Sequence, residues 1–200
     1  MKKFTITFIM VIFGACMLNS YAQTTTSFGI KLNGNLTNVK LKKLDDNGSF
    51  KPGASFGGFS KIEFSKNFAL QPELMFNYTE KKLHTDNSKV KYKYGSVEIP
   101  VYALGQFEAG SGKVFVGVGP HIGYGFSVDS RKEGIDDSVK GADKPELTHW
   151  YMGGGIIAGY EFNNGLIINA GYQLGYDLRS SSKKSNMDTQ TISLGIGYRF

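Results

Sequence analysis

Apolar side chains recur at every second position through most of the chain after its first 22 residues. In the closing segment TISLGIGYRF, the apolar set Ile192, Leu194, Ile196, Tyr198 and Phe200 alternates with small or polar residues. Successive side chains of a β-strand point to opposite faces, so this period gives each strand one apolar and one polar face. No later segment has a convincing helical period. The sequence therefore predicts an all-β fold.

The alternation and the turn signals together predict eight strands. They cover residues 25–37, 52–65, 67–80, 92–108, 112–128, 148–163, 165–179 and 188–200. Three connections, SKN, AGSG and NNG, have the composition of tight hairpins. The other four are longer and polar, at about 38–51, 81–91, 129–147 and 180–187. Short and long turns alternate, and both chain ends fall on the short-turn side.

Proline removes a ladder donor, so we expect local bulges near Pro72, Pro100 and Pro120.

The face that fills the interior decides between two barrels. A membrane barrel turns its apolar face outward, whereas a soluble exported barrel that binds an apolar ligand turns it inward. An eight-stranded barrel has an interior just wide enough to be filled by side chains. The polar face carries charges of both signs in similar number, as a self-neutralising buried network requires. Its larger members are Lys31, Asn33, Lys61, Glu63, Gln71, Glu73, Glu98, His121, Glu161, Asn169, Gln173 and Arg199.

The apolar face is ordered along the strands, with aromatic residues at both ends and aliphatic residues between them. The short-turn ends carry Phe64, Phe68, Phe107, Phe162, Tyr198 and Phe200, and the long-loop ends carry Tyr78, Phe126, Trp150 and Tyr176. At about 3.3 Å per residue and about 40° of tilt, the segment from Phe68 to Tyr78 spans roughly 25 Å, the height of an outer-membrane apolar band. Alternation also occurs in soluble sandwiches, but these two girdles favour an eight-stranded antiparallel up-and-down transmembrane β-barrel.

The N-terminal segment is typical of a secretory signal peptide. Lys2 and Lys3 precede an apolar run that is short for a membrane-spanning helix, and Ser20, Tyr21 and Ala22 follow it. We expect a signal peptide at 1–22 and one barrel domain at 23–200. A lipoprotein site at Cys16 is the weaker alternative, because Phe13 stands where a smaller aliphatic residue is expected.

With these segments in view, the chain resembles the small outer-membrane β-barrel domain family often called the porin family, of the eight-stranded OmpA/OmpX type. The resemblance rests on FALQPELMFNYTEKK, YGSVEIPVYALGQF, FVGVGPHIGYGF and ISLGIGYRF. It implies a Gram-negative outer membrane, termini in the periplasm and four external loops. It also implies that Tyr198 and Phe200 help the barrel assembly machinery to recognise the last strand. A wide pore is not expected, because aqueous channels are a feature of 16–18 strands.

The polar face suggests an interior network, which we predict to include Lys31, Lys61, Glu73, Glu98, Glu161 and Arg199. If the second hairpin turns about Lys66, Lys61 lies diagonally across from Glu73. Glu98 on the neighbouring strand could join this pair. We predict that the network plugs the lumen, which gives the protein a structural or surface-interaction role. The alternative is a narrow, low-conductance channel for ions or small solutes.

The segment GGGIIA at 153–158 fits a loose dinucleotide fingerprint. That fingerprint needs a strand before it and a helix after it, whereas here the strand pattern continues. Gly153, Gly155 and Gly159 fall on the polar face, where small residues leave room for larger neighbours. We therefore expect no nucleotide site and no cofactor.

The three histidines, His84, His121 and His149, are far apart in sequence. Because a metal site needs two or three converging ligands, we expect no metal. Some small outer-membrane barrels modify lipid A with a rim histidine beside a serine and a carboxylate. His149 with Glu146 and Thr148 is the nearest approximation, and no serine stands beside it. We therefore predict no catalytic site and no enzymatic activity.

Charge limits the partners of the protein. Without Lys2 and Lys3 the chain has 21 basic and 17 acidic residues, a mild excess with no run that suggests nucleic-acid binding. The segment TEKKLHTDNSKVKYK has a basic excess, which would favour the phosphates of lipopolysaccharide just above the membrane. We expect a monomer that contacts outer-membrane lipid and lipopolysaccharide, with loops available to an extracellular partner.

Overall fold

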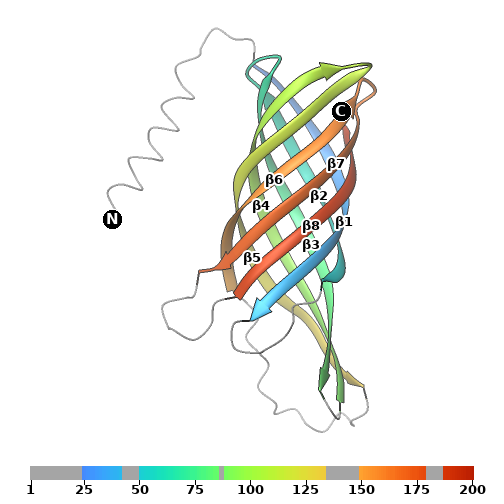
Figure 1. The fold of residues 1–200 in the computed structure, drawn as a ribbon, viewed down its shortest axis with the longest axis vertical. Coiled ribbons are helices and arrows are strands. Elements are labelled where there is room, and N and C mark those ends of the chain that lie inside the picture. The colour runs from blue at the N-terminus through green and yellow to red at the C-terminus, as the bar shows by residue number, and fades with distance from the viewer. Residues whose placement is uncertain (1–23, 42–49, 86–87, 134–148, 179–186) are drawn as a thin grey trace, which may run out of the picture.

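The computed structural model describes residues 24–41, 50–85, 88–133, 149–178 and 187–200, and these form a closed antiparallel barrel (Figure 1). Its strands are β1 (Thr25–Leu41), β2 (Lys51–Glu63), β3 (Phe68–Thr85), β4 (Ser88–Ala109), β5 (Gly112–Glu133), β6 (His149–Phe162), β7 (Leu166–Asp177) and β8 (Met187–Arg199). Each strand pairs with the next along the chain, and β8 closes the barrel on β1, where Arg199 pairs with Gly29. The predicted eight-stranded up-and-down barrel is confirmed. Within the described ranges, no helix is long and apolar enough to cross a membrane.

The three tight hairpins lie at one end of the barrel, which we call the short-hairpin end; the opposite end is the long-loop end. The start of β1 and the C-terminus share the short-hairpin end (Figure 1). Gly110 and Gly165 stand in two of these turns with φ angles of 60° and 87°. Only glycine adopts this left-handed region without a steric penalty, so the AGSG and NNG turns depend on these two residues.

The long-loop end differs from the prediction at two of its connections. Residues 81–91, predicted to be a loop, are mostly strand: β3 continues to Thr85 and β4 begins at Ser88. β5 likewise runs to Glu133, well into the predicted loop at 129–147. The three strands extend together beyond the rest of the barrel (Figure 1). The prediction was wrong because the high charge of this segment indicated a loop, whereas the ladder continues and pairs Leu83 with Val90 and Lys81 with Tyr92.

The predicted bulges are also misplaced. Around the prolines some ladder pairs are missing, but the register is unchanged: Pro72 pairs with Val101 and Met75 with Glu98 in one continuous alignment. The register shifts instead between Lys93 and Tyr94, where β4 meets β5. A proline can thus lose its ladder bond without adding a residue to the strand, whereas an added residue changes the register.

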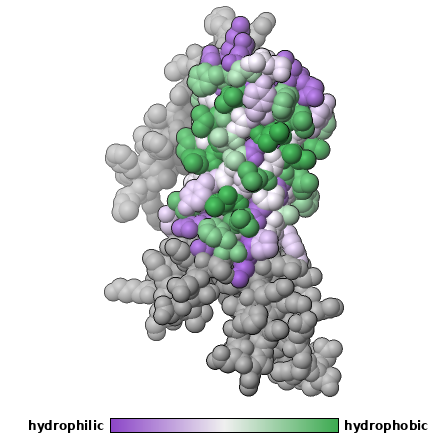
Figure 2. Space-filling view, turned by 45° about the vertical axis from the view of Figure 1, so that its right-hand side comes forward, coloured by the Kyte–Doolittle hydropathy of each residue, from purple (hydrophilic) through white to green (hydrophobic). Residues whose placement is uncertain are grey.

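The two faces of the sheet are inverted relative to a soluble protein. The outer face is apolar: Leu194 is 67% exposed and Phe28 62%, whereas the lysine side chain at position 61 is 1% exposed inside the barrel. Figure 2 shows apolar residues distributed over the middle of the outer face, with hydrophilic residues toward its two ends. Phe68, Phe107, Tyr198 and Phe200 are exposed near the short-hairpin end, and Tyr78, Trp150 and Tyr176 near the long-loop end. These positions match the two predicted girdles.

Candidate functional site

The interior at the short-hairpin end contains an ion-pair cluster centred on Glu161. Its Oε2 lies 2.7 Å from the Lys61 Nζ, and its Oε1 lies 2.6 Å from the Arg199 Nε. Lys61 and Glu161 are almost fully buried, while the Arg199 side chain is 28% exposed. Each oxygen of the buried carboxylate therefore has its own cationic partner, and the cluster joins β2, β6 and β8 across the lumen.

A second carboxylate extends this cluster toward the short-hairpin rim. Glu63 Oε1 accepts hydrogen bonds from Gln106 Nε2 at 2.6 Å and from Lys113 Nζ at 3.0 Å, and lies 3.9 Å from Lys61 Nζ. Glu63 and Lys113 are more exposed than the Glu161 pair. The chain of contacts thus connects five strands at this end of the barrel.

Lys61 does not pair with Glu73. Although the register leaves the two diagonal across β2 and β3, Glu73 Oε1 lies 2.5 Å from Lys31 Nζ and also accepts a bond from Gln71 Nε2 at 2.7 Å. The predicted Lys61–Glu73 pair is therefore wrong. Lys31 pairs with Gly57 of β2, and its ammonium lies 5.9 Å from the centre of the Phe59 ring and against Glu73 of β3. The ammonium of Lys61 lies instead against Glu161 of β6.

Glu98 lies apart from both ion-pair groups. Its Oε2 accepts a hydrogen bond from the Tyr151 hydroxyl at 3.0 Å, and its Oε1 accepts one from Gln173 Nε2 at 2.6 Å. Gln173 Nε2 also lies 3.1 Å from the Tyr102 hydroxyl. The structure thus places all six predicted network residues inside the barrel, but Glu98 does not join Lys61 and Glu73.

An apolar layer crosses the interior beside the ion pairs, and sequence analysis missed it. It consists of Phe59, Ala69, Tyr102, Leu104, Phe115, Ile157 and Ile167, all at most 4% exposed. Tyr102 and Leu104 are large apolar residues at positions of β4 where the alternation expects polar ones. This departure was the signal in the sequence from which the layer could have been predicted. Gly117 and Gly159 make room for the layer, because a Cβ on either would overlap Leu104 or Phe115. We refer to these seven residues as the apolar layer.

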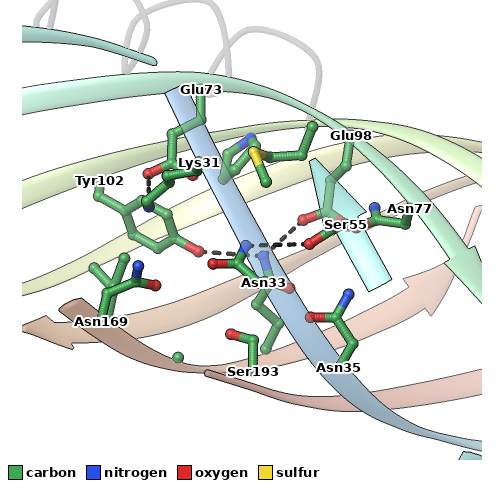
Figure 3. A pocket seen from close by; sticks show the side chains of 15 residues that line it. Lys31, Asn33, Asn35, Ser55, Glu73, Asn77, Glu98, Tyr102, Asn169 and Ser193 are labelled. Carbon is green, nitrogen blue, oxygen red and sulfur yellow. Dashed lines mark hydrogen bonds and ion pairs between the residues drawn. The ribbon is translucent and has the colours of Figure 1, made fainter. Parts of the chain in front are cut away.

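A small cavity of about 30 Å³ lies on the long-loop side of this layer (Figure 3). Lys31, Asn33 and Asn35 line it from β1, and Glu98 and Tyr102 line it from β4. This volume is room for about two water molecules. We refer to it as the lumen cavity.

The other predicted candidates do not converge. His121 is buried in the interior, packed against the Tyr151 ring at 6.1 Å, and Gly153 and Gly175 leave the space for its imidazole. The segment 153–158 lies within strand β6, so the helix of a dinucleotide site is absent there. Among the described residues, no three histidine, cysteine or acidic side chains are grouped to hold a metal.

The rim candidates and the signal peptide cannot be placed in the same way. The side chains of His84 and His149 fall outside the described part of the chain, as do Glu146, Thr148 and residues 1–23 with Cys16. The predicted signal peptide at 1–22 and the rim histidine arrangement therefore stay predictions.

The sequence profile of the outer membrane protein beta-barrel domain matches residues 8–200. The chain belongs to this family. Its apolar outer face and closed ladder are those of a transmembrane barrel in the outer membrane, which agrees with the resemblance drawn from the sequence. No curated protein matches this outer-membrane barrel significantly.

Solved structures of other small barrels are similar to this family member. Neisserial surface protein A has a TM-score of 0.52 at 13% identity, over 88% of this chain and 99% of that chain. Ail of Yersinia pestis, in complex with the heparin analogue sucrose octasulfate, has a TM-score of 0.47 at 16% identity, over 88% and 99%. OprG of Pseudomonas aeruginosa has a TM-score of 0.45 at 13% identity, over 87% and 96%. At these identities the likeness to Neisserial surface protein A concerns the fold alone.

Proposed function

We propose that this protein is a non-enzymatic, monomeric component of a Gram-negative outer membrane, with a closed interior and external loops that contact the surroundings. The observation that supports this proposal most strongly is the filled lumen. Ion pairs bridge the short-hairpin end, and the apolar layer lies directly beside them. Both termini of the barrel would then lie in the periplasm, and the extended β3–β4–β5 sheet would project from the cell.

The same arrangement argues against the alternative, a channel for ions or small solutes. An ion that entered the apolar layer would lose its hydration without gaining polar ligands, and this is costly. Leu104 is 1% exposed and Phe115 3%, so neither leaves an open path at its level. The lumen cavity is limited to about 30 Å³ and lies on one side of the layer.

Conductance of the purified protein in planar lipid bilayers tests the closed lumen. We expect no stable single-channel steps, because the apolar layer excludes hydrated ions. Replacing Leu104 and Phe115 together by alanine removes two large side chains of the layer and should produce small, measurable steps. Stable steps from the unaltered protein would support the channel instead.

The external partner that we propose is the phosphate-bearing part of lipopolysaccharide. The ladders place Lys82, Lys91 and Arg131 in one row across β3, β4 and β5. From the period of two along β3 and β4, we expect this row to share the sheet face of Tyr78 and Ile99, which are exposed on the outer, lipid-facing side. Lys82 follows Tyr78 of the aromatic girdle by four positions, so we expect the row at the level of the lipid headgroups. Cations near an anionic membrane surface contribute about 1 kcal/mol each.

The double variant Lys82→Gln/Arg131→Gln tests this row. We expect binding of fluorescent lipopolysaccharide to the detergent-solubilised barrel to weaken roughly thirtyfold, because two charges near the headgroups are lost. The matched control is Lys81→Gln/Lys132→Gln, which removes two charges from the adjacent positions of β3 and β5, where the period of two predicts the opposite sheet face. Equal weakening by the two double variants would contradict a specific role for the row.

A further inference from the structure

Among the described residues, the lining of the lumen cavity contains two carboxylates, Glu73 and Glu98, but one cation, Lys31. The Lys31 ammonium lies 2.5 Å from Glu73. Glu98 is 6% exposed, yet its two oxygens accept hydrogen bonds only from the neutral groups of Tyr151 and Gln173 among the described residues. A buried carboxylate is costly unless a cation compensates it. The charge of Glu98 therefore lacks a partner of opposite sign within this part of the chain.

Two amide oxygens in the lining of the same cavity also lack partners. The Oδ1 atoms of Asn33 and Asn35 are buried and accept no hydrogen bond from the described residues, whereas Asn33 Nδ2 donates to Ser55 Oγ at 3.1 Å. Asn33 is 9% exposed and Asn35 7%. Figure 3 shows the Asn35 amide directed toward the interior of this cavity, near Ser193. Asn169 Nδ2, on β7, is a buried donor without an acceptor among the described residues.

The size and surroundings of the cavity restrict what could satisfy these groups. About 30 Å³ holds an ion with one or two waters, whereas a sugar or an amino acid would not fit. Unpaired carboxylate and amide oxygens are the ligands of hard cations. A bound water can in turn accept the hydrogen bond that Asn169 Nδ2 offers. A single uncompensated charge matches a monovalent ion.

We propose that the lumen cavity binds one small monovalent metal cation, of the size of Na⁺, from the long-loop side. Glu98 supplies the compensating charge, and the amide oxygens of Asn33 and Asn35 with bound water complete the oxygen shell. The apolar layer closes the site on the other side, so the cation stabilises the barrel without passing through it. This role is independent of any partner outside the barrel.

Thermal unfolding of the refolded barrel in detergent tests the site. The midpoint is compared in NaCl and in N-methyl-D-glucamine chloride at equal ionic strength, since the organic cation is too large for the cavity. With free Na⁺ about ten times its dissociation constant, we expect NaCl to raise the midpoint by about 4 °C. Glu98→Gln should abolish this difference, whatever its effect on the midpoint itself.

Two further variants separate the site from general charge effects. Glu63→Gln removes a carboxylate paired with Lys113 at the other end of the interior, and should retain the full Na⁺ effect. Asn35→Asp adds a further carboxylate to the cavity and should increase the effect, which provides a test even if Glu98→Gln does not fold.

The proposal is wrong if the unaltered protein unfolds at the same temperature in both salts. It is equally wrong if Glu98→Gln retains the difference in unfolding midpoint between the two salts. That result is expected if the Glu98 carboxyl is protonated and binds no cation.

Discussion

Replacing Glu161 by alanine should destabilise the barrel by about 3–5 kcal/mol, the range typical for breaking a buried ion pair by removing one partner. Its carboxylate is the only described group within 3 Å of the Lys61 ammonium, which would then face Glu63 alone at 3.9 Å. Arg199 would lose its partner at 2.6 Å as well, although its greater exposure lets water compensate part of that loss. The free energy of unfolding, measured by urea titration in lipid vesicles, checks this expectation.

Glu63→Ala is the matched control for this prediction. It removes the same side-chain atoms at the same end of the interior, but Glu63 and its partner Lys113 are partly exposed. Partly exposed pairs contribute about 1 kcal/mol or less, and the buried Gln106 amide would also lose its acceptor, so we expect Glu63→Ala to cost about 2 kcal/mol. If the two variants were destabilised equally, the Glu161 cluster would not be the main electrostatic stabiliser of the interior.

The sequence predicted the fold well because a period of two reports directly on which face each side chain occupies. Strand β8 is the clearest case: Leu194 and Ile196 are exposed on the outer face, and Arg199 turns inward to Glu161, as the alternation requires. Hairpin chemistry predicted three of the neighbouring pairs, β2–β3, β4–β5 and β6–β7, since a tight turn forces its two strands to be neighbours. Closure then followed from the pairing of β8 with β1.

The interior contacts were predictable only in part, because alternation places a residue in the lumen without giving its distance from residues on other strands. Lys61 and Glu161 are 100 positions apart and meet across the lumen, not along a ladder. Tyr102 and Leu104 depart from the alternation of β4, yet the layer that they form depends on Phe115 and Ile157 from two further strands. The lumen cavity likewise depends on which side chains leave space, and a one-dimensional pattern does not contain that information.

The C-terminal residue provides the second large expected effect. Phe200 is 72% exposed, its ring packs edge-on against Tyr198 at 5.6 Å, and its backbone N–H donates to the Phe28 carbonyl at 2.8 Å. Removing it deletes one closing hydrogen bond of the barrel, a modest loss of about 1 kcal/mol. It also removes the terminal aromatic through which, by resemblance to other outer-membrane barrels, we propose that the assembly machinery recognises the last strand.

Deletion of Phe200 should therefore lower the amount of folded barrel in outer-membrane fractions at least tenfold while changing its stability in detergent only slightly. Heat-dependent gel mobility of isolated membranes measures the first quantity, and urea unfolding of the refolded protein measures the second. Phe28→Ala is the matched control, because it removes a ring that is 62% exposed, against 72% for Phe200, from the neighbouring strand and leaves the terminus intact. A similar fall in membrane abundance for both variants would mean that lipid-facing aromatic area, and not the position of Phe200 at the chain end, determines assembly. A large loss of stability in detergent would instead assign the effect to closure of β8 on β1, since the Phe200–Phe28 bond is the last one of that seam.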